Sequence, residues 1–302
     1  MTRRTALTAG AGLVLALGAL VLAQQPIRLP SSPPQLFGAS VTPAFEGWWD
    51  NPDGTHSFLI GYFSRNTEAV VDVPIGPNNK FEPGNPDMGQ PTHFLPRRHF
   101  GMFVVNVPKD FQKTQKITWT LTVASNTVSI PFHMHTDYGI SAFKSTEEAS
   151  GRRFNEPPSI RFAEAGPAIK GPIGTPLKAI ERTAKVGTPM PLDVWAEDDG
   201  VYTTGTNAPL LADRPPVTWA VTKYRGPGTV KVGEGLKLTT TKGGKAMQAY
   251  AGKGSTTVSF SEAGDYMLHV QLNDYSGQGG GGSGCCWTTA IVKVQVAAAG
   301  AQ

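Results

Sequence analysis

Two histidines separated by one residue, His133 and His135, are the first candidates for chemistry in this chain. Side chains alternate between the two faces of a β-strand, so both imidazoles are expected on the same side of the strand predicted there. Two imidazoles at this spacing can share a metal ion, and the thioether of Met102 would suit copper. His93 and His99 could complete the ligand set only if the fold brought them close. The alternative is a pair of solvent-exposed strand histidines.

A second candidate is an aromatic group for ligand binding that contains Trp48, Trp49 and Tyr62, with Asp50 as a neighbouring carboxylate. Flat aromatic rings offer a large apolar face at a low entropic cost, and sugar rings stack on such faces. Adjacent strand residues point to opposite sides, so one tryptophan is expected in the core and the other outside. The alternative is that these rings are structural.

The only two cysteines, Cys285 and Cys286, follow the glycine-rich stretch "SGQGGGGSG". Catalytic redox pairs have two residues between their thiols at the start of a helix, and a structural zinc site needs about four ligands, so neither pattern fits. A disulfide between neighbours would close a strained ring, because disulfides prefer Cα atoms about 5.5–6 Å apart. The flanking glycines would allow such a bend. We predict this bond, with a buried thiol beside an exposed one as the alternative.

Sequence patterns of hydrolytic enzymes are missing. The chain contains no Gly-x-Ser-x-Gly and no His-Glu-x-x-His motif. Sequence alone cannot place Glu46 and Asp50 at the separation that glycoside hydrolysis requires. The stretches "NPDGT" and "WAEDDG" offer oxygen atoms for calcium but do not complete an EF-hand loop, and they are interpreted as turns. We therefore expect neither enzymatic activity nor a cofactor.

The N-terminus predicts export. Arg3 and Arg4 precede an uncharged apolar stretch over residues 5–23, which is typical of a secretory signal peptide cleaved after Ala23. The alternative is an uncleaved membrane anchor, since the stretch approaches the roughly 20 residues that span a bilayer. Cleavage would lower the basic residues from 27 to 25 against 23 acidic ones. We expect a periplasmic, cell-surface or extracellular protein with no membrane span after cleavage.

The composition predicts a chain rich in turns and poor in helix. Its 302 residues include 35 Gly and 25 Pro, and the charged fraction of 17% is below the usual value of about 25%. The basic residues are scattered, and no basic run is interleaved with aromatic residues, so a nucleic-acid partner is not expected.

After a proline-rich spacer over residues 24–37, the first domain is expected over residues 38–165 as a β-sandwich. Its predicted strands lie in "HSFLIGYFSR", "MFVVNVP", "KITWTLTVAS", "TVSIPFHMH" and "SIRFAEAG". Alternation in the third of these places four apolar residues on one face: Ile117, Trp119, Leu121 and Val123. Loops 46–56 and 76–99 are expected to carry specificity, because rigid sandwiches present binding residues in loops.

A linker and first-strand region over residues 166–187 leads to a second domain over residues 188–298. Strands are predicted in "PMPLDVWAEDDG", "PPVTWAVTKYRGPGTVKV", "STTVSFSEAGDYMLHVQLND" and "WTTAIVKVQV". About seven short strands at this spacing are typical of an immunoglobulin-like sandwich. The fold class expected for the whole chain is therefore all-β, with two immunoglobulin-like β-sandwich domains in tandem after a signal peptide.

The second domain resembles the polycystic-kidney-disease (PKD) type of immunoglobulin-like repeat over residues 189–296. The matching positions are Trp219, Gly226 to Gly228, Gly264, Tyr266, Leu268, Val270 and Asp274. The chain departs from the pattern in "LKLTTTKGGKAMQAYAGKG" and in the long glycine-rich loop after Asp274. The resemblance implies a non-catalytic spacer or adhesion module. The N-terminal part resembles a segment of uncharacterised exported bacterial proteins, which supplies no function.

Together these features predict an exported, non-catalytic binding, structural or adhesion protein of the cell envelope, with a protein or glycan as its partner. The alternatives are a periplasmic copper-binding protein that uses His133 and His135, or a glycan-active module.

Overall fold

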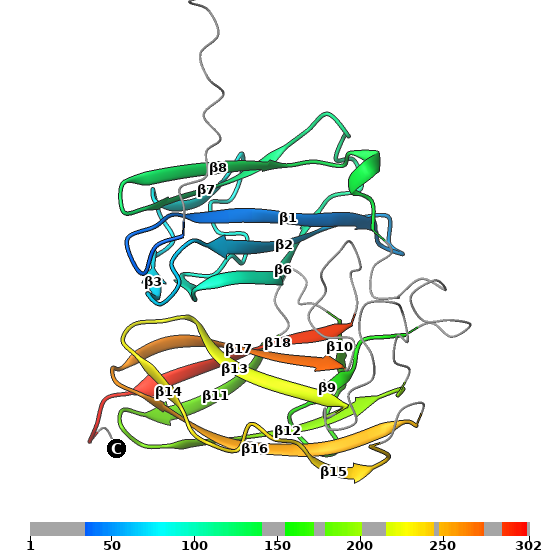
Figure 1. Cartoon of the computed structure of the whole chain (residues 1–302), viewed down its shortest axis with the longest axis vertical. Coiled ribbons are helices and arrows are strands. Elements are labelled where there is room, and N and C mark those ends of the chain that lie inside the picture. The colour runs from blue at the N-terminus through cyan, green and yellow to red at the C-terminus, as the bar shows by residue number, and fades with distance from the viewer. Residues whose placement is uncertain are drawn as a thin grey trace, which may run out of the picture. The chain divides into compact units, whose positions relative to one another are not determined.

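The computed structural model describes residues 34–140, 155–171, 179–200, 216–244, 248–274 and 286–300. Its elements are β-strands, with one short 3-10 turn, η1 (Thr136–Tyr138) (Figure 1). The predicted all-β fold class is thus confirmed. The predicted leader, residues 24–33 of the spacer and Cys285 lie outside the described residues. None of the helices in the described part is long and apolar enough to cross a membrane.

The first sandwich has two three-stranded sheets and a small two-stranded one. In Figure 1, β7 and β8 form a layer separate from β1, β2 and β6. One sheet has the order β1 (Val41–Asp50), β2 (His56–Ser64), β6 (Arg97–Val107); the other has β4 (Asn79–Glu82), β7 (Ile117–Val123), β8 (Asn126–Phe132); and β3 (Val71–Asp72) pairs with β5 (His93–Phe94).

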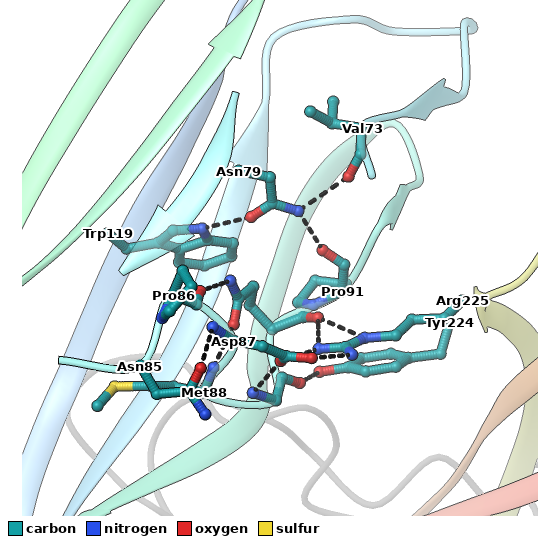
Figure 2. Close-up of polar contacts among 12 residues, drawn as sticks. Val73, Asn79, Asn85, Pro86, Asp87, Met88, Pro91, Trp119, Tyr224 and Arg225 are labelled. Carbon is teal, nitrogen blue, oxygen red and sulfur yellow. Dashed lines mark hydrogen bonds and ion pairs between the residues drawn. The ribbon is translucent and has the colours of Figure 1, made fainter. Parts of the chain in front are cut away.

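Period-two alternation builds the core of the first sandwich. The four apolar residues of β7 are buried and its threonines face outward, as predicted from the sequence. Trp119 is fully buried, and its indole N–H donates to the side-chain oxygen of Asn79 over 2.9 Å. The amide nitrogen of Asn79 donates in turn to the carbonyls of Val73 and Pro91, both at 2.9 Å (Figure 2). One buried side chain therefore fixes three separate segments of this sandwich around its largest aromatic residue.

The second sandwich has a six-stranded and a four-stranded sheet. The larger sheet comprises β9 (Ser159–Arg161), β10 (Ile169–Lys170), β12 (Met190–Asp198), β14 (Val230–Val232), β15 (Thr239–Lys242) and β16 (Tyr250–Phe260). The smaller has the order β11 (Ala179–Lys185), β18 (Trp287–Ala297), β17 (Gly264–Asp274), β13 (Val217–Arg225), in which β11 runs parallel to β18. The chain passes from one sheet to the other between β12 and β13 and between β16 and β17, as in immunoglobulin-like sandwiches.

Two sequence predictions about strands need correction. Residues 46–50, expected in a loop, belong to β1, whose pairing with β2 continues to Asp50. The stretch "SIRFAEAG", expected as the last strand of the first domain, contributes β9, which pairs with β12 of the second sandwich. Residues 46–50 lack a clean apolar alternation, so only their pairing with β2 shows that they extend the strand. β9 does alternate, but alternation does not tell which sheet a strand joins.

The two sandwiches share an apolar junction, and residues 34–302 form one compact unit. In β2, Phe58 and Ile60 point into the core of the first sandwich, whereas Leu59 points the other way. Leu59 packs with Val104 of β6 and with Trp287 of β18. Tyr224 and Ile291, from the second sandwich, belong to the core of the first. The sheet of β1, β2 and β6 is therefore buried on both faces along part of its length.

Polar contacts close the same junction around the segment 87–92 (Figure 2). The Arg225 guanidinium binds both carboxylate oxygens of Asp87, at 2.7 and 2.8 Å, and also the carbonyl of Gln90. This bond to Arg225 lowers the pKa of Asp87. The Tyr224 hydroxyl donates to the carbonyl of Gly89, and the Thr92 amide donates to the carbonyl of Tyr224 over 3.1 Å. This part of the predicted recognition loop 76–99 is thus occupied by the second sandwich.

Replacing Gly101 by alanine should destabilise the junction. A Cβ at Gly101 would lie 2.3 Å from Cζ2 of Trp287, and the backbone φ of +48° is left-handed. Overpacking typically costs about 1–3 kcal/mol, so the free energy of unfolding in urea should fall by that amount beyond the backbone cost. Gly38→Ala is the matched control, since Gly38 has φ +75° with nothing within 4 Å of its Cβ position. Equal losses in the two variants would contradict the packing described here.

Candidate functional site: the Trp48–Tyr138 surface

Sequence candidates that were considered separately meet on one face of the first sandwich. We call this face the Trp48–Tyr138 surface. It is formed by residues from β1, from β2 and from the segment that follows β8: Trp48, Asp50, His56, His133, His135 and Tyr138.

Trp48 joins β1 to the segment that carries the histidines. Its indole N–H donates to the carbonyl of His135 over 2.7 Å. Its own backbone carbonyl accepts from the amide of Ile140 at 2.9 Å, and Trp48 forms a parallel bridge with Gly139. The turn η1 is therefore held against the end of β1 by both a side chain and the backbone.

The two tryptophans diverge as strand geometry predicts. Trp48 packs at the margin of the first core, with its ring centroid 6.2 Å from that of His56. Trp49 packs against the junction cluster of Leu59, Val104 and Trp287. Trp48 is consequently the tryptophan that contributes to the surface, and Trp49 is a packing residue.

His133 and His135 face the same side, because Met134 between them is buried in the core. Their ring centroids lie 6.0 Å apart at an interplanar angle of 84°. The ring of Tyr138, which is 48% exposed, lies 5.8 Å from His133 and 5.4 Å from His135. The result is a cluster of three solvent-facing rings on a β-scaffold.

The electrostatics of this cluster favour neutral imidazole at His133. Desolvation, the nearby Lys116 and the neighbouring His135 together lower the pKa of His133. The Asp137 amide donates to Nδ1 of His135 over 3.3 Å, which places the proton of a neutral His135 on Nε2. In the part of the chain that the structure describes, no group of three or more His, Cys, Asp or Glu side chains is arranged to hold a metal ion.

Asp50 lies at the rim of the surface and is 70% exposed in its side chain, with Oδ1 2.6 Å from Nδ1 of His56. The following stretch "NPDGT" is a tight turn, as interpreted from the sequence. Asp53 Oδ1 accepts from both the amide and the hydroxyl of Thr55, and the hydroxyl bond is the largest cause of the lowered pKa of Asp53. The Asp53 carboxylate therefore serves to close this turn.

Two predicted candidates lie elsewhere, in the interior. Tyr62 is fully buried, its hydroxyl accepts from the amide of Leu95 over 3.0 Å, and burial raises its pKa. Met102 is only 5% exposed and belongs to the first core. Tyr62 therefore offers no ring face to a ligand in solution, and Met102 is not part of the exposed histidine cluster.

His93 and His99 also have other partners. His93 Nδ1 lies 2.8 Å from Asp72 Oδ1, and His99 Nε2 donates to the carbonyl of Pro96 over 3.0 Å. Both are near the junction rather than on the Trp48–Tyr138 surface, so they do not complete a ligand set with His133 and His135.

Cys286 is buried at the start of β18, and its carbonyl accepts from the amide of Asp274 over 3.2 Å. Cys285 lies outside the described residues, so the predicted bond between the two cysteines stays a prediction.

Sequence reasoning missed His56 and Tyr138. Tyr138 lies in "HMHTDY", three residues beyond the histidine pair, and only the turn at Thr136 brings its ring back over them. His56 begins the strand that pairs with Trp48 and Asp50, so correct pairing of β1 with β2 would have indicated it.

Comparison with known proteins does not assign this surface. No protein-family model matches the chain, and no curated protein matches it. Among solved structures, the chain is similar to the ASH/PapD-like domain of human CEP192 (PapD-like domain 7) at 14% identity. The match covers 56% of this chain and 99% of that chain with a TM-score of 0.25. A likeness at this level supports no inference about the site.

Replacing Trp48 by phenylalanine should loosen η1. The variant keeps an aromatic ring and loses the indole donor to the His135 carbonyl, and an intramolecular hydrogen bond typically contributes about 0.5–1.5 kcal/mol. We expect a loss of that size in the free energy of unfolding and faster amide exchange at Ile140. Tyr138→Phe is the control, since it keeps the exposed ring. Unchanged exchange at Ile140 in Trp48→Phe would show that the indole does not hold the turn.

Proposed function

We propose that this chain is an exported, non-catalytic binding protein whose recognition surface is the Trp48–Tyr138 surface. The observation that carries the proposal is the convergence of an exposed tyrosine ring and two imidazoles on the segment that follows β8, which the bond from Trp48 to His135 fastens to β1. Rigid aromatic residues bind at a low entropic cost, because few side-chain rotations must be frozen.

A sugar ring is the ligand that this chemistry fits best. The Tyr138 ring offers an apolar face for stacking. The imidazoles of His133 and His135 beside it, and the carboxylate of Asp50 at the rim of the surface, offer donors and acceptors for hydroxyl groups. An apolar face surrounded by a few hydrogen-bonding groups is the usual composition of a small-ligand site. We infer a glycan as the partner.

The second sandwich would serve as a support of the PKD type. The resemblance around Trp219 and Tyr266 suggests this role, and the extensive junction with the first sandwich is consistent with a rigid spacer. Export, inferred from the N-terminal sequence, would place the recognition surface outside the cytoplasm, where glycans are abundant.

Binding to a glycan array should depend on Tyr138. We expect the purified protein to bind a subset of surface polysaccharides, and Tyr138→Ala to weaken that binding about tenfold, equivalent to about 1.4 kcal/mol. Leu236→Ala is the control, since Leu236 is an exposed apolar residue of the second sandwich. If no glycan binds, or if Tyr138→Ala binds as well as the unaltered chain, the proposed recognition surface is wrong.

A second candidate function is metal binding by His133 and His135. It is favoured by the close ring pair and by the Asp137 carboxylate, whose Oδ2 lies 3.5 Å from Nδ1 of His135. Nitrogen and oxygen ligands of this kind suit Cu(II) or Zn(II).

Isothermal titration with Cu(II) and Zn(II) tests this second function. We expect micromolar binding that is lost in His133→Ala/His135→Ala, because both imidazoles are removed. His56→Ala, which removes an imidazole already paired with Asp50, should leave the titration unchanged. Absence of binding in the unaltered chain would end the metal hypothesis without affecting the glycan one.

A further inference from the structure

Three of the six histidines of the chain lie at the junction between the sandwiches. They are His93 in β5, His99 in β6 and His269 in β17. Burial lowers the pKa of all three. Burial therefore disfavours the charged form of each of these three imidazoles.

His269 is the most deeply enclosed of the three. It is 3% exposed, and its ring stacks on Tyr224 of β13 with centroids 5.8 Å apart and an interplanar angle of 17°. Its Nε2 is buried without a hydrogen-bond partner. Across the junction, His269 is hydrogen bonded to the backbone of Met102. His99 lies close enough that a positive charge on it would lower the pKa of His269 further. Its cross-strand neighbour in β18 is the apolar Ile291.

His99 and Tyr62 form the corresponding pair of rings on the first sandwich. Its ring stacks on Tyr62, with centroids 4.9 Å apart and an interplanar angle of 25°. The Tyr62 hydroxyl accepts from Leu95, and the Tyr224 hydroxyl donates to Gly89. Burial raises the pKa of both phenols, so neither is available as a charged partner. A histidine–tyrosine stack from each sandwich thus contributes to one buried region.

The carboxylates of the junction are already engaged. Asp87 is bound to Arg225. Asp72 is shared between His93 and Lys223. The Nζ of Lys223 lies 3.2 Å from Oδ1 of Asp72, and the Lys223 side chain is 5% exposed. Glu46 lies 2.5 Å from Arg98. Among the described residues, no acidic side chain contributes to the pKa of His269, and the groups that do are His99 and the Met102 backbone.

We propose that the junction is an acid-sensitive closure, in which protonation of His269, assisted by His99, separates the two sandwiches while each stays folded. A second proton at His99 adds repulsion to the cost of burying the first. The neutral rings of His269 and His99 stack on tyrosines at the junction. Their charged forms would need water or a carboxylate, and among the described residues no acidic side chain contributes to the pKa of His269.

The direction of the pH dependence follows from proton binding. Burial depresses the pKa of His269 from 6.5 to about 4 in the closed junction, and opening restores the ordinary value. The closed form therefore binds fewer protons, so its advantage is complete above pH 6.5 and is lost as the pH falls from 6.5 towards 4. For His269 alone, the ratio of open to closed molecules should rise up to about tenfold per pH unit in that window.

Hydrogen exchange of the full chain, followed from pH 7.5 to 4.5 and corrected for the intrinsic exchange rate, tests this proposal. The Thr92 amide bonds to the Tyr224 carbonyl across the junction, so its protection should fall as the pH drops below 6.5. Amides of β7 pair only within the first sandwich and should stay protected. Protection of Thr92 that is independent of pH, or that is lost together with that of β7, would overturn the proposal.

A variant without the titrating group provides the second test. His269→Phe keeps a ring on Tyr224, and it should lower the acid-induced loss of protection at Thr92 several-fold at pH 5.5. His135→Phe, which alters an exposed histidine, should leave the loss unchanged. If His269→Phe does not give the native near-ultraviolet dichroism at pH 7.5, His269→Gln takes its place. An acid response equal to that of the unaltered chain would exclude His269 as the sensor.

Discussion

The burial of one sheet on both of its faces is the constraint on which this structure depends. The sheet of β1, β2 and β6 must fill the first sandwich with Phe58 and Ile60 and must also meet Trp287 through Leu59. Such a strand cannot follow a simple apolar and polar alternation, and "FLI" in β2 is apolar at every position. The two sandwiches are therefore coupled through a shared layer rather than a loose linker.

That coupling explains which candidate residues reach solvent. Residues on the junction side of the sheet, such as Trp49, pack against the cluster that contains Trp287 of the second sandwich. Among the described residues, the second sandwich does not cover the segment after β8, whose turn leaves Tyr138 and His135 exposed and His133 partly exposed. The Trp48 side chain fixes this turn to the covered sheet. Recognition chemistry in the first sandwich thus depends on an anchor that the core supports.

Sequence patterns predicted the strands well where one face is polar and one is buried, as in β7 with its outward threonines and in β12. They also placed His133 and His135 on a common side. They could not predict the junction, because Leu59, Trp287 and His269 look like ordinary strand residues until the other sandwich covers them. The position of Tyr138 could not be predicted either, because it depends on a turn that is held by the bond from Trp48 to His135. These two residues are 87 positions apart in the sequence.

The parallel pairing of β11 with β18 has a mechanical consequence. Seven residue pairs, from Ala179 with Ile291 to Lys185 with Ala297, join these strands. A force that enters β11 at Ala179 and leaves β18 at Ala297 pulls two parallel strands in opposite directions along their length. Their ladder bonds are then loaded together in shear, instead of opening one after another like a zipper. A force applied between these two points therefore meets all seven pairs of the ladder at once.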